Sequence, residues 1–294
     1  MMLMPVLPAA FALASLVVVW ACSLSARHDI AARSLAVTLG LVSAAVVLAV
    51  SLVAVAWMIP VEHALWCQRM LGHSADHRPV AGATLLGLVI AVGVRSGVVA
   101  SRIRRIWLAE SLGRSTVDIE ESAAAYAFAV PGRNRHSRGG HIVVSTGMLA
   151  ALTCDEQRAL FAHESAHLRL AHHRYLLFGR TVEGLLPPLR PLVRRLLWTI
   201  ERWADEVAAQ ELGDRGLMAS ALGKAALAAT DHNEAAFLGL RSDSLLGRVE
   251  ALLQPATSGA ARRRLPLGCA VSTAAVSAMT QLHHLVGAVQ QISH

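Results

Sequence analysis

Long apolar runs alternate with charged segments along the chain, and this pattern separates a membrane part from a polar part. Residues 1–26 and 35–61 carry no charged side chain, and residues 80–100 carry only Arg95, near the end of the run. A helix of roughly 20 apolar residues crosses the core of a bilayer. The pattern therefore predicts three transmembrane helices, at about residues 5–26, 35–59 and 80–100.

The two ends of the chain need separate arguments. A cleaved signal peptide is the alternative for the first run, but such a peptide normally begins with positive charge, and none precedes Arg27. Residues 265–294 contain no Asp, Glu, Lys or Arg, although Ser, Thr, Gln and His weaken their apolar character. We expect a fourth transmembrane helix there.

Arginines indicate how the chain crosses the membrane. They occur in the connection after the first run, directly after the third run at Arg102, Arg104 and Arg105, and just before the last run at residues 262–264. The positive-inside rule places such clusters in the cytoplasm. We therefore expect a membrane part at 1–101, a cytoplasmic domain at 102–264 and a last transmembrane helix at 265–294.

The expected cytoplasmic domain has α+β character, so the fold class is a mainly helical membrane protein with a small sheet. Residues 116–119, 124–130 and 141–146 are predicted strands, and the turn-rich PGRNRHSRGG between the last two favours a hairpin. Residues after Gly147 are predicted to be helical. Thr153 and Glu156 have capping-box spacing, and Gly213 is placed to end a helix that begins near Pro191.

Composition narrows the class of protein. Apolar residues make up 54% of the chain and charged residues only 16%, which is unusual for a soluble domain. The net charge of +7 comes mainly from arginine, and no motif typical of nucleic-acid binding accompanies it, so we expect no direct nucleic-acid binding. Four cysteines without paired spacing argue against a disulfide framework and against a cysteine zinc site.

The segment FAHESAHLRLAHHRY, residues 161–175, contains the candidate chemistry. His163, Glu164 and His167 form an H-E-x-x-H pattern, in which two histidines four residues apart project from one face of a helix and can bind one zinc ion. Glu164, one step around the helix, can then act as the general base toward water. This pattern predicts a zinc hydrolase, and Zn²⁺ is the expected cofactor.

A third protein ligand is required, and two solutions exist. In one class a glycine ends the helix and a histidine six residues after the second one binds the metal. That histidine would be His173, but Leu170 occupies the glycine position and favours a continuing helix, which would direct His172 and His173 elsewhere, as surface or supporting groups.

The other solution is a glutamate on a second helix. In ERWAD, Glu201 and Asp205 share a helix face, so Glu201 could bind zinc while Asp205 supports a histidine ligand. An ordinary solvated acidic face is the alternative for this pair. Glu183 is a rival ligand, although the nearby Gly184 and Pro187-Pro188 make its surroundings irregular.

The combination of IVVSTGML, DEQRALFAHESAHLRLAHH and P-L-V-R-R-x-x-x-x-x-E-x-x-A-D resembles the glutamate-type zinc peptidases of membranes. It is most similar to the BlaR/MecR-type signal transducers of metallopeptidase family 56, and next to the HtpX-like group. The resemblance covers about residues 142–211, with RVEALL (248–253) as a weaker match. It implies His163, His167 and Glu201 as ligands, Glu164 as base and Asp205 in support.

The resemblance also implies a function. We expect a zinc endopeptidase (gluzincin) of the bacterial plasma membrane that cleaves a cytoplasmic protein, either a transcriptional repressor or itself, in signal transduction. A quality-control protease of membrane proteins and a non-catalytic signalling scaffold are the alternatives. The strand at 141–146, if it is a sheet edge, could hold an extended substrate. The sensors' extracellular penicillin-binding domain has no counterpart in this sequence, so we do not expect β-lactam sensing by acylation.

Overall fold

The computed structural model describes residues 27–58, 78–110, 116–132, 140–230 and 242–254. The chain divides into two compact units. Unit 1 comprises Met1–Val99, Gly179–Arg194 and Arg263–His294, and unit 2 comprises Ala100–Phe178 and Arg195–Arg262. The predicted first and fourth transmembrane helices lie outside the described residues.

Unit 1 contains two long apolar helices, α2 (His28–Met58) and the greater part of α4 (Arg78–Glu110). α2 covers the second predicted span as far as its described end at Met58 and begins seven residues before it. α4 contains the third predicted span, begins two residues before it and continues ten residues past residue 100. Among the described residues, His28–Leu48 and Val80–Arg105 are long and apolar enough to cross a membrane. Large apolar side chains of α4 are exposed, among them Leu88, Ile90 and Val94. Such an uncovered apolar surface favours membrane association.

The end of α7 (His172–Leu185) also belongs to unit 1 and packs closely on α4. A Cβ atom on Gly184 would lie 3.1 Å from the Ser96 hydroxyl, so a larger residue would require Ser96 to shift by a few tenths of an ångström. A short 3-10 helix, η3 (Pro187–Leu189), then connects α7 to α8 (Arg190–Leu212). The division into units falls within α4, α7 and α8.

Unit 2 contains a three-stranded sheet of β1 (Val117–Glu120), β2 (Ala127–Val130) and β3 (His141–Ser145), in the order β1-β3-β2. β1 pairs with β3 in parallel, and β2 pairs with β3 antiparallel, so the predicted hairpin is confirmed. The condition for substrate binding at the 141–146 segment, that it is a sheet edge, is not met, because β3 lies between the other two strands. All five residues of β3 are buried, as expected for a central strand.

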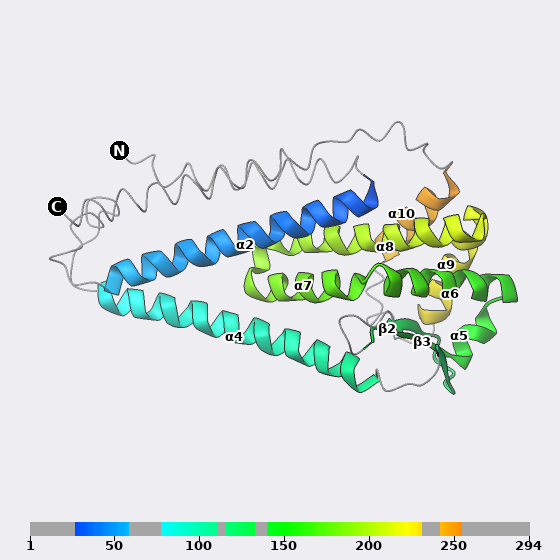
Figure 1. Cartoon of the computed structure of the whole chain (residues 1–294), viewed down its shortest axis with the longest axis horizontal. Helices are drawn as coiled ribbons and strands as arrows, with labels where there is room; N and C mark the ends of the chain where they lie inside the picture. Colours follow the sequence, from blue (N-terminus) through cyan, green and yellow to red (C-terminus); the bar gives the residue numbers. More distant parts are fainter. Residues whose placement is uncertain (1–26, 59–77, 111–115, 133–139, 231–241, 255–294) are drawn as a thin grey trace. The chain divides into compact units, whose positions relative to one another are not determined.

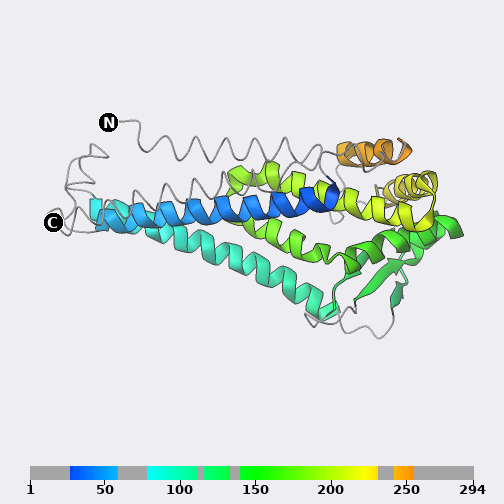
Figure 2. The ribbon, with the colours of Figure 1, turned by 45° about the horizontal axis from the view of Figure 1, so that its top comes forward.

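Helices pack on this sheet and on one another to form the core of unit 2. They are α5 (Thr146–Ala151), α6 (Cys154–Arg169), the main part of α8, α9 (Arg215–Thr230) and α10 (Ser242–Leu253). One buried cluster joins α6, α8, α9 and α10, largely through alanines such as Ala159 and Ala208, and a second joins α5 and α6 to the sheet. Figure 1 and Figure 2 show β2 and β3 beside α6.

Local signals in the sequence set the ends of α6 and α8. The Thr153 side chain accepts a hydrogen bond from the Glu156 N–H, and the Glu156 carboxylate accepts one from the Thr153 N–H, so the predicted capping box is confirmed. Gly213 follows α8 with a φ of 72°, the left-handed conformation that glycine adopts without strain. The predicted end of this helix is therefore also confirmed.

The predicted continuation of the motif helix through Leu170 is wrong. α6 ends at Arg169, Leu170 caps it, and Ala171 adopts a φ of 53° before α7 begins at His172. A left-handed residue with a Cβ atom costs free energy, which the surrounding packing must offset. Helix propensity alone favoured continuation, and tertiary contacts of the buried His172 override it.

Candidate metal centre

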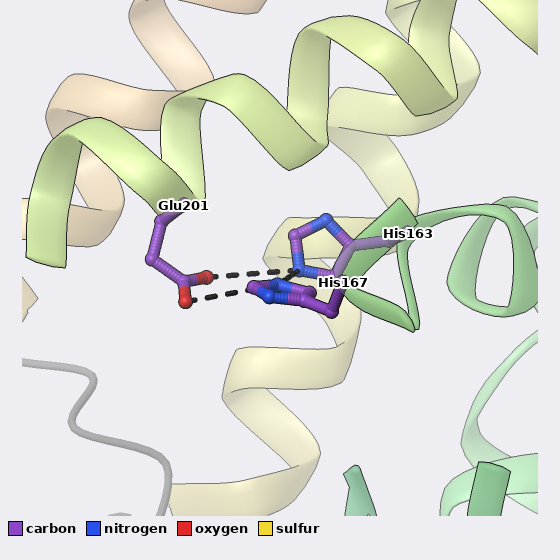
Figure 3. Close-up of side chains that lie close together, drawn as sticks. All are labelled: His163, His167 and Glu201. Atoms are coloured by element: carbon purple, nitrogen blue, oxygen red, sulfur yellow. Dashed lines mark hydrogen bonds and ion pairs between the residues drawn. The ribbon is translucent and has the colours of Figure 1, made fainter. Parts of the chain in front are cut away.

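His163 and His167 of α6 and Glu201 of α8 form a compact group of candidate metal ligands, with their ligand atoms within 4.8 Å of one another (Figure 3). The two histidine Nε2 atoms are 3.1 Å apart. Glu201 places Oε2 3.6 Å from Nε2 of His163 and Oε1 3.7 Å from Nε2 of His167. One helical turn separates the histidines, and the second helix contributes the carboxylate, as the sequence predicted.

The spacing fits a zinc ion. Ligand atoms about 2.0–2.2 Å from a tetrahedral zinc are separated by roughly 3.3–3.6 Å along the edges of the tetrahedron. The three separations lie close to that range, so only small adjustments of the side chains would be needed. Both histidines are nearly buried, whereas the Glu201 side chain is 36% exposed, so solvent reaches the group on the glutamate side.

Glu164, the predicted base, is buried beside this group at 9% exposure. Its carboxyl group accepts a hydrogen bond from the backbone N–H of Ala129 in β2. Burial raises the pKa of Glu164 to about 7, and the Glu201 charge acts in the same direction, while His163 and Arg248 oppose the rise. A carboxyl group with a pKa near neutrality is suited to accept and release a proton.

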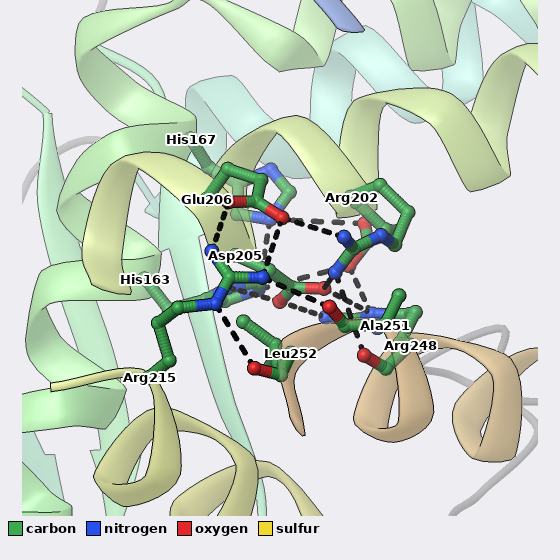
Figure 4. Close-up of polar contacts among 10 residues, drawn as sticks. His163, His167, Arg202, Asp205, Glu206, Arg215, Arg248, Ala251 and Leu252 are labelled. Atoms are coloured by element: carbon green, nitrogen blue, oxygen red, sulfur yellow. Dashed lines mark hydrogen bonds and ion pairs between the residues drawn. The ribbon is translucent and has the colours of Figure 1, made fainter. Parts of the chain in front are cut away.

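Asp205, the predicted supporting residue, lies on the opposite side of the His163 ring from the ligand nitrogen. Its Oδ1 is 3.2 Å from Nδ1 of His163, and its side chain is fully buried. Arg248 of α10 donates two hydrogen bonds to Asp205, from Nε at 2.8 Å and from Nη2 at 2.7 Å (Figure 4). The remaining Nη1 of Arg248 is 3.1 Å from Glu201 Oε2, so one guanidinium group holds both carboxylates.

Further ion pairs extend this network to α9 and α10. Arg202, buried at 3% exposure, donates to Glu206 at 2.6 Å and lies 3.7 Å from Asp205. Glu206 also accepts from Arg215, which donates to the backbone carbonyls of Ala251 and Leu252. Asp205 and Glu206 therefore do not belong to an ordinary solvated face, since they connect the centre to α9 and α10.

Electrostatics around the group favour a cation. Burial lowers the pKa of His163, but contacts with Asp205 and Glu201 outweigh burial and raise it to about 10. Burial alone would raise the pKa values of Glu201 and Asp205, yet nearby His and Arg side chains hold both well below their usual range. A centre that so favours positive charge on His163 also favours a metal ion in the same place.

His172 lies behind His167. It is 1% exposed, and its Nδ1 is 3.1 Å from Nδ1 of His167. Burial lowers the pKa of His172 to about 3 and that of His167 to about 4. His172 therefore contacts His167 on the side away from the group of ligands, and of the two expected roles, surface or supporting group, its burial excludes the surface one.

Sequence reasoning missed or misjudged other residues. Arg248 belongs to the RVEALL segment, whose resemblance to other peptidases was the only available signal of its importance. The rival ligand Glu183 instead pairs with Arg180 and Arg190. His172 contacts the Nδ1 side of His167, opposite the nitrogen that faces Glu201, so it lies away from the position of a metal-bound substrate.

Comparisons with known proteins agree with this centre. The family model described as Peptidase family M48 matches residues 98–186, which include His163, Glu164 and His167. Neither a curated protein nor a solved structure matches the chain. The match does not show the family-56 type that the motifs resemble, and it ends before Glu201, Asp205 and Arg248. Together with the geometry, it supports a metallopeptidase of the M48 type, a family that is typically zinc-dependent.

Proposed function

We propose that the protein is a zinc-dependent endopeptidase held at the bacterial plasma membrane by its apolar helices, with the peptidase centre in the cytoplasm. The observation that carries this proposal is the His163–His167–Glu201 group with Glu164 buried beside it. The M48 match gives independent support for a metallopeptidase. The exposed apolar surface of α4 and the arginines that follow it support the membrane attachment and the orientation.

In this proposal His163, His167 and Glu201 hold the zinc ion. Zinc, when bound, supplies a Lewis acid that polarises a peptide carbonyl and makes water more acidic. Glu164 accepts the proton of the attacking water and passes it to the departing amine. Asp205 and Arg248 keep His163 and Glu201 in place, and the partly exposed Glu201 leaves the centre open to a substrate.

β2 is the strand we propose for holding an extended substrate, in place of the buried β3. Ser145 N–H donates to Tyr126 C=O, so Tyr126 directs its backbone groups toward β3. Because this direction alternates along a strand of an antiparallel pair, Ala127 and Ala129 direct their backbone N–H and C=O groups away from β3. Ala129 uses its N–H toward Glu164, which shows how near this edge lies to the base. A peptide paired along β2 would therefore pass next to the catalytic group.

The substrate is a cytoplasmic protein or the cytoplasmic part of a membrane protein. Cleavage of a transcriptional repressor or of the chain itself, in signal transduction, remains our prediction from the family-56 resemblance. Quality control of damaged membrane proteins is the second candidate, since the matching family is M48 and a membrane-held centre would act on neighbouring proteins.

The experiment that tests the proposal is Glu164→Gln in the full chain, purified in detergent and loaded with zinc. We expect cleavage of unfolded casein to fall by roughly 10²–10⁴-fold, the range for loss of a general base, while zinc stoichiometry stays that of the wild type. Glu183→Gln, at the rejected rival position, is the matched control and should retain full activity. Undiminished casein cleavage by the Glu164 variant would refute the proposed chemistry.

A further inference from the structure

We propose that His172 is a positioning residue that holds the His167 imidazole so that its Nε2 faces the metal. This inference rests on the proposed zinc centre and adds a residue that neither the H-E-x-x-H pattern nor the Glu201 assignment includes. It is carried by the contact between the two Nδ1 atoms, by the burial of His172 and by the break between α6 and α7.

The contact has a defined chemical consequence. A neutral imidazole carries one N–H donor and one acceptor nitrogen, and two nitrogens 3.1 Å apart share one hydrogen. If His167 is to offer a lone pair at Nε2, its hydrogen must be on Nδ1, so Nδ1 of His172 must be the acceptor. Accepting that hydrogen selects the metal-binding tautomer of His167 and fixes the plane of its ring.

His172 is itself held firmly in place. It is the first residue of α7, directly after the left-handed Ala171, which separates α7 from α6. The Trp203 ring, two residues after Glu201 in α8, packs against it with ring centroids 5.1 Å apart, and Tyr175 lies on another side at 6.3 Å. The His172 ring therefore cannot easily leave His167, since α8 packs against it.

Packing alone does not explain a histidine at this position. Nε2 of His172 is buried and has no hydrogen-bond partner among the described residues, which costs free energy. An apolar side chain would fill the space beside Trp203 and His167 without that cost. Within the described part of the chain, the polar contact of His172 is with His167, so we infer that its benefit arises there.

Four substitutions separate positioning from packing. His172→Leu fills the space without an acceptor. His172→Asn places its amide oxygen at the position of Nδ1, whereas His172→Gln places it one carbon farther along the side chain. His173→Leu is the matched control, because His173 is adjacent and only partly buried. Zinc affinity of the purified full-length chain is measured by competition with a chromophoric chelator.

We expect His172→Leu and His172→Gln to bind zinc 10–100-fold more weakly than the wild type, the usual effect of losing a partner of a metal-binding histidine. His172→Asn should recover most of the affinity, and His173→Leu should match the wild type. Wild-type affinity in His172→Leu, or affinity in His172→Asn as low as in His172→Gln, would overturn the inference.

Thermal denaturation of the zinc-free variants shows whether each one folds. If His172→Leu does not fold, the comparison of the Asn and Gln variants, which are both polar, decides the matter. Casein cleavage by the wild type is measured separately. If His172→Leu loses zinc affinity but the zinc-loaded wild type cleaves no casein, the inference is supported and the proposed function is contradicted. If the wild type is active but His172→Leu keeps its zinc affinity, only the inference is contradicted. A wild type that binds no zinc would contradict both.

Discussion

The two proposed histidine ligands are supported by different chemistry. His163 has a carboxylate behind it, and that carboxylate is held by two hydrogen bonds from Arg248. His167 has the imidazole of His172 behind it, and that imidazole packs against Trp203 and lies near Tyr175. A buried charge that loses its partner is much more costly than a neutral group that loses one. We therefore infer that the His163 side determines the stability and strength of the centre, while the His167 side determines orientation.

The largest effect should follow from Arg248→Met. Asp205 is fully buried, and without Arg248 its negative charge would lose its strongest partner. Removing one member of a buried ion pair destabilises a protein by about 3–5 kcal/mol. Chemical denaturation of the zinc-free chain in detergent measures the change. Arg169→Met, which breaks the exposed pair with Glu211, is the control and should cost at most about 1 kcal/mol. Equal losses in both variants would show that the His163 side has no special role in stability.

A smaller effect is expected from Asp205→Asn, which keeps the shape of the side chain and removes its charge. His163 would then donate to a neutral amide oxygen, which makes the histidine a weaker ligand. Zinc affinity should fall by about 100-fold, the upper end of the usual range, and by no less than in His172→Leu. The chelator competition that serves for His172 compares the two sides directly. A larger loss on the His167 side would reverse our ranking of the two supports.

How far the centre was predictable depends on how local each contact is. The spacing within H-E-x-x-H places His163, Glu164 and His167 by helix geometry alone, and the i, i+4 pair Glu201–Asp205 was found in the same way. The expected hairpin and capping box depend on neighbouring residues too, and both are present. These features follow from positions close together in the sequence.

The unpredicted features depend on distant contacts. Arg248 is far from Asp205 in the sequence, and no local pattern marks it as a partner. The end of α6 was mistaken because Leu170 and Ala171 have good helix propensity, whereas the contacts of His172 with His167 and Trp203 decide the fold there. Whether the 141–146 strand lies at a sheet edge was left open, because strand order depends on the pairing of β1 with β3, which residue types do not reveal.

The smallest effect on the centre should come from Glu156, two helical turns before His163 in α6. Lys224 is the main cause that lowers the pKa of Glu156 from 4.5 to about 2, with further hydrogen bonds from Thr153 and Ser220. A carboxyl group whose pKa is lower in the folded than in the unfolded chain stabilises the fold at pH values above its unfolded-state pKa. For Glu156 this stabilisation is lost as the pH falls from about 4.5 toward 2.

Glu156→Gln should therefore destabilise the chain by about 1–3 kcal/mol at neutral pH, the range for hydrogen bonds to charged groups, and by progressively less below pH 4.5. Denaturation curves across this pH range test the expectation, with the exposed Asp155→Asn as control. Zinc affinity should stay unchanged in both variants. A clear loss of affinity in Glu156→Gln would mean that support for the centre extends along α6 beyond its two histidines.

The position of Arg248 in the chain has a consequence for biosynthesis. Proteins are made from the N-terminus, and His163, His167, Glu201 and Asp205 all leave the ribosome before Arg248 does. During that interval the ligands are present, but the guanidinium group that holds Glu201 and Asp205 is not. We therefore expect the centre of an unfinished chain to bind zinc weakly. The proposed peptidase activity would then arise only after α10 has been made and has folded, so the growing chain would not cleave its own unfolded segments.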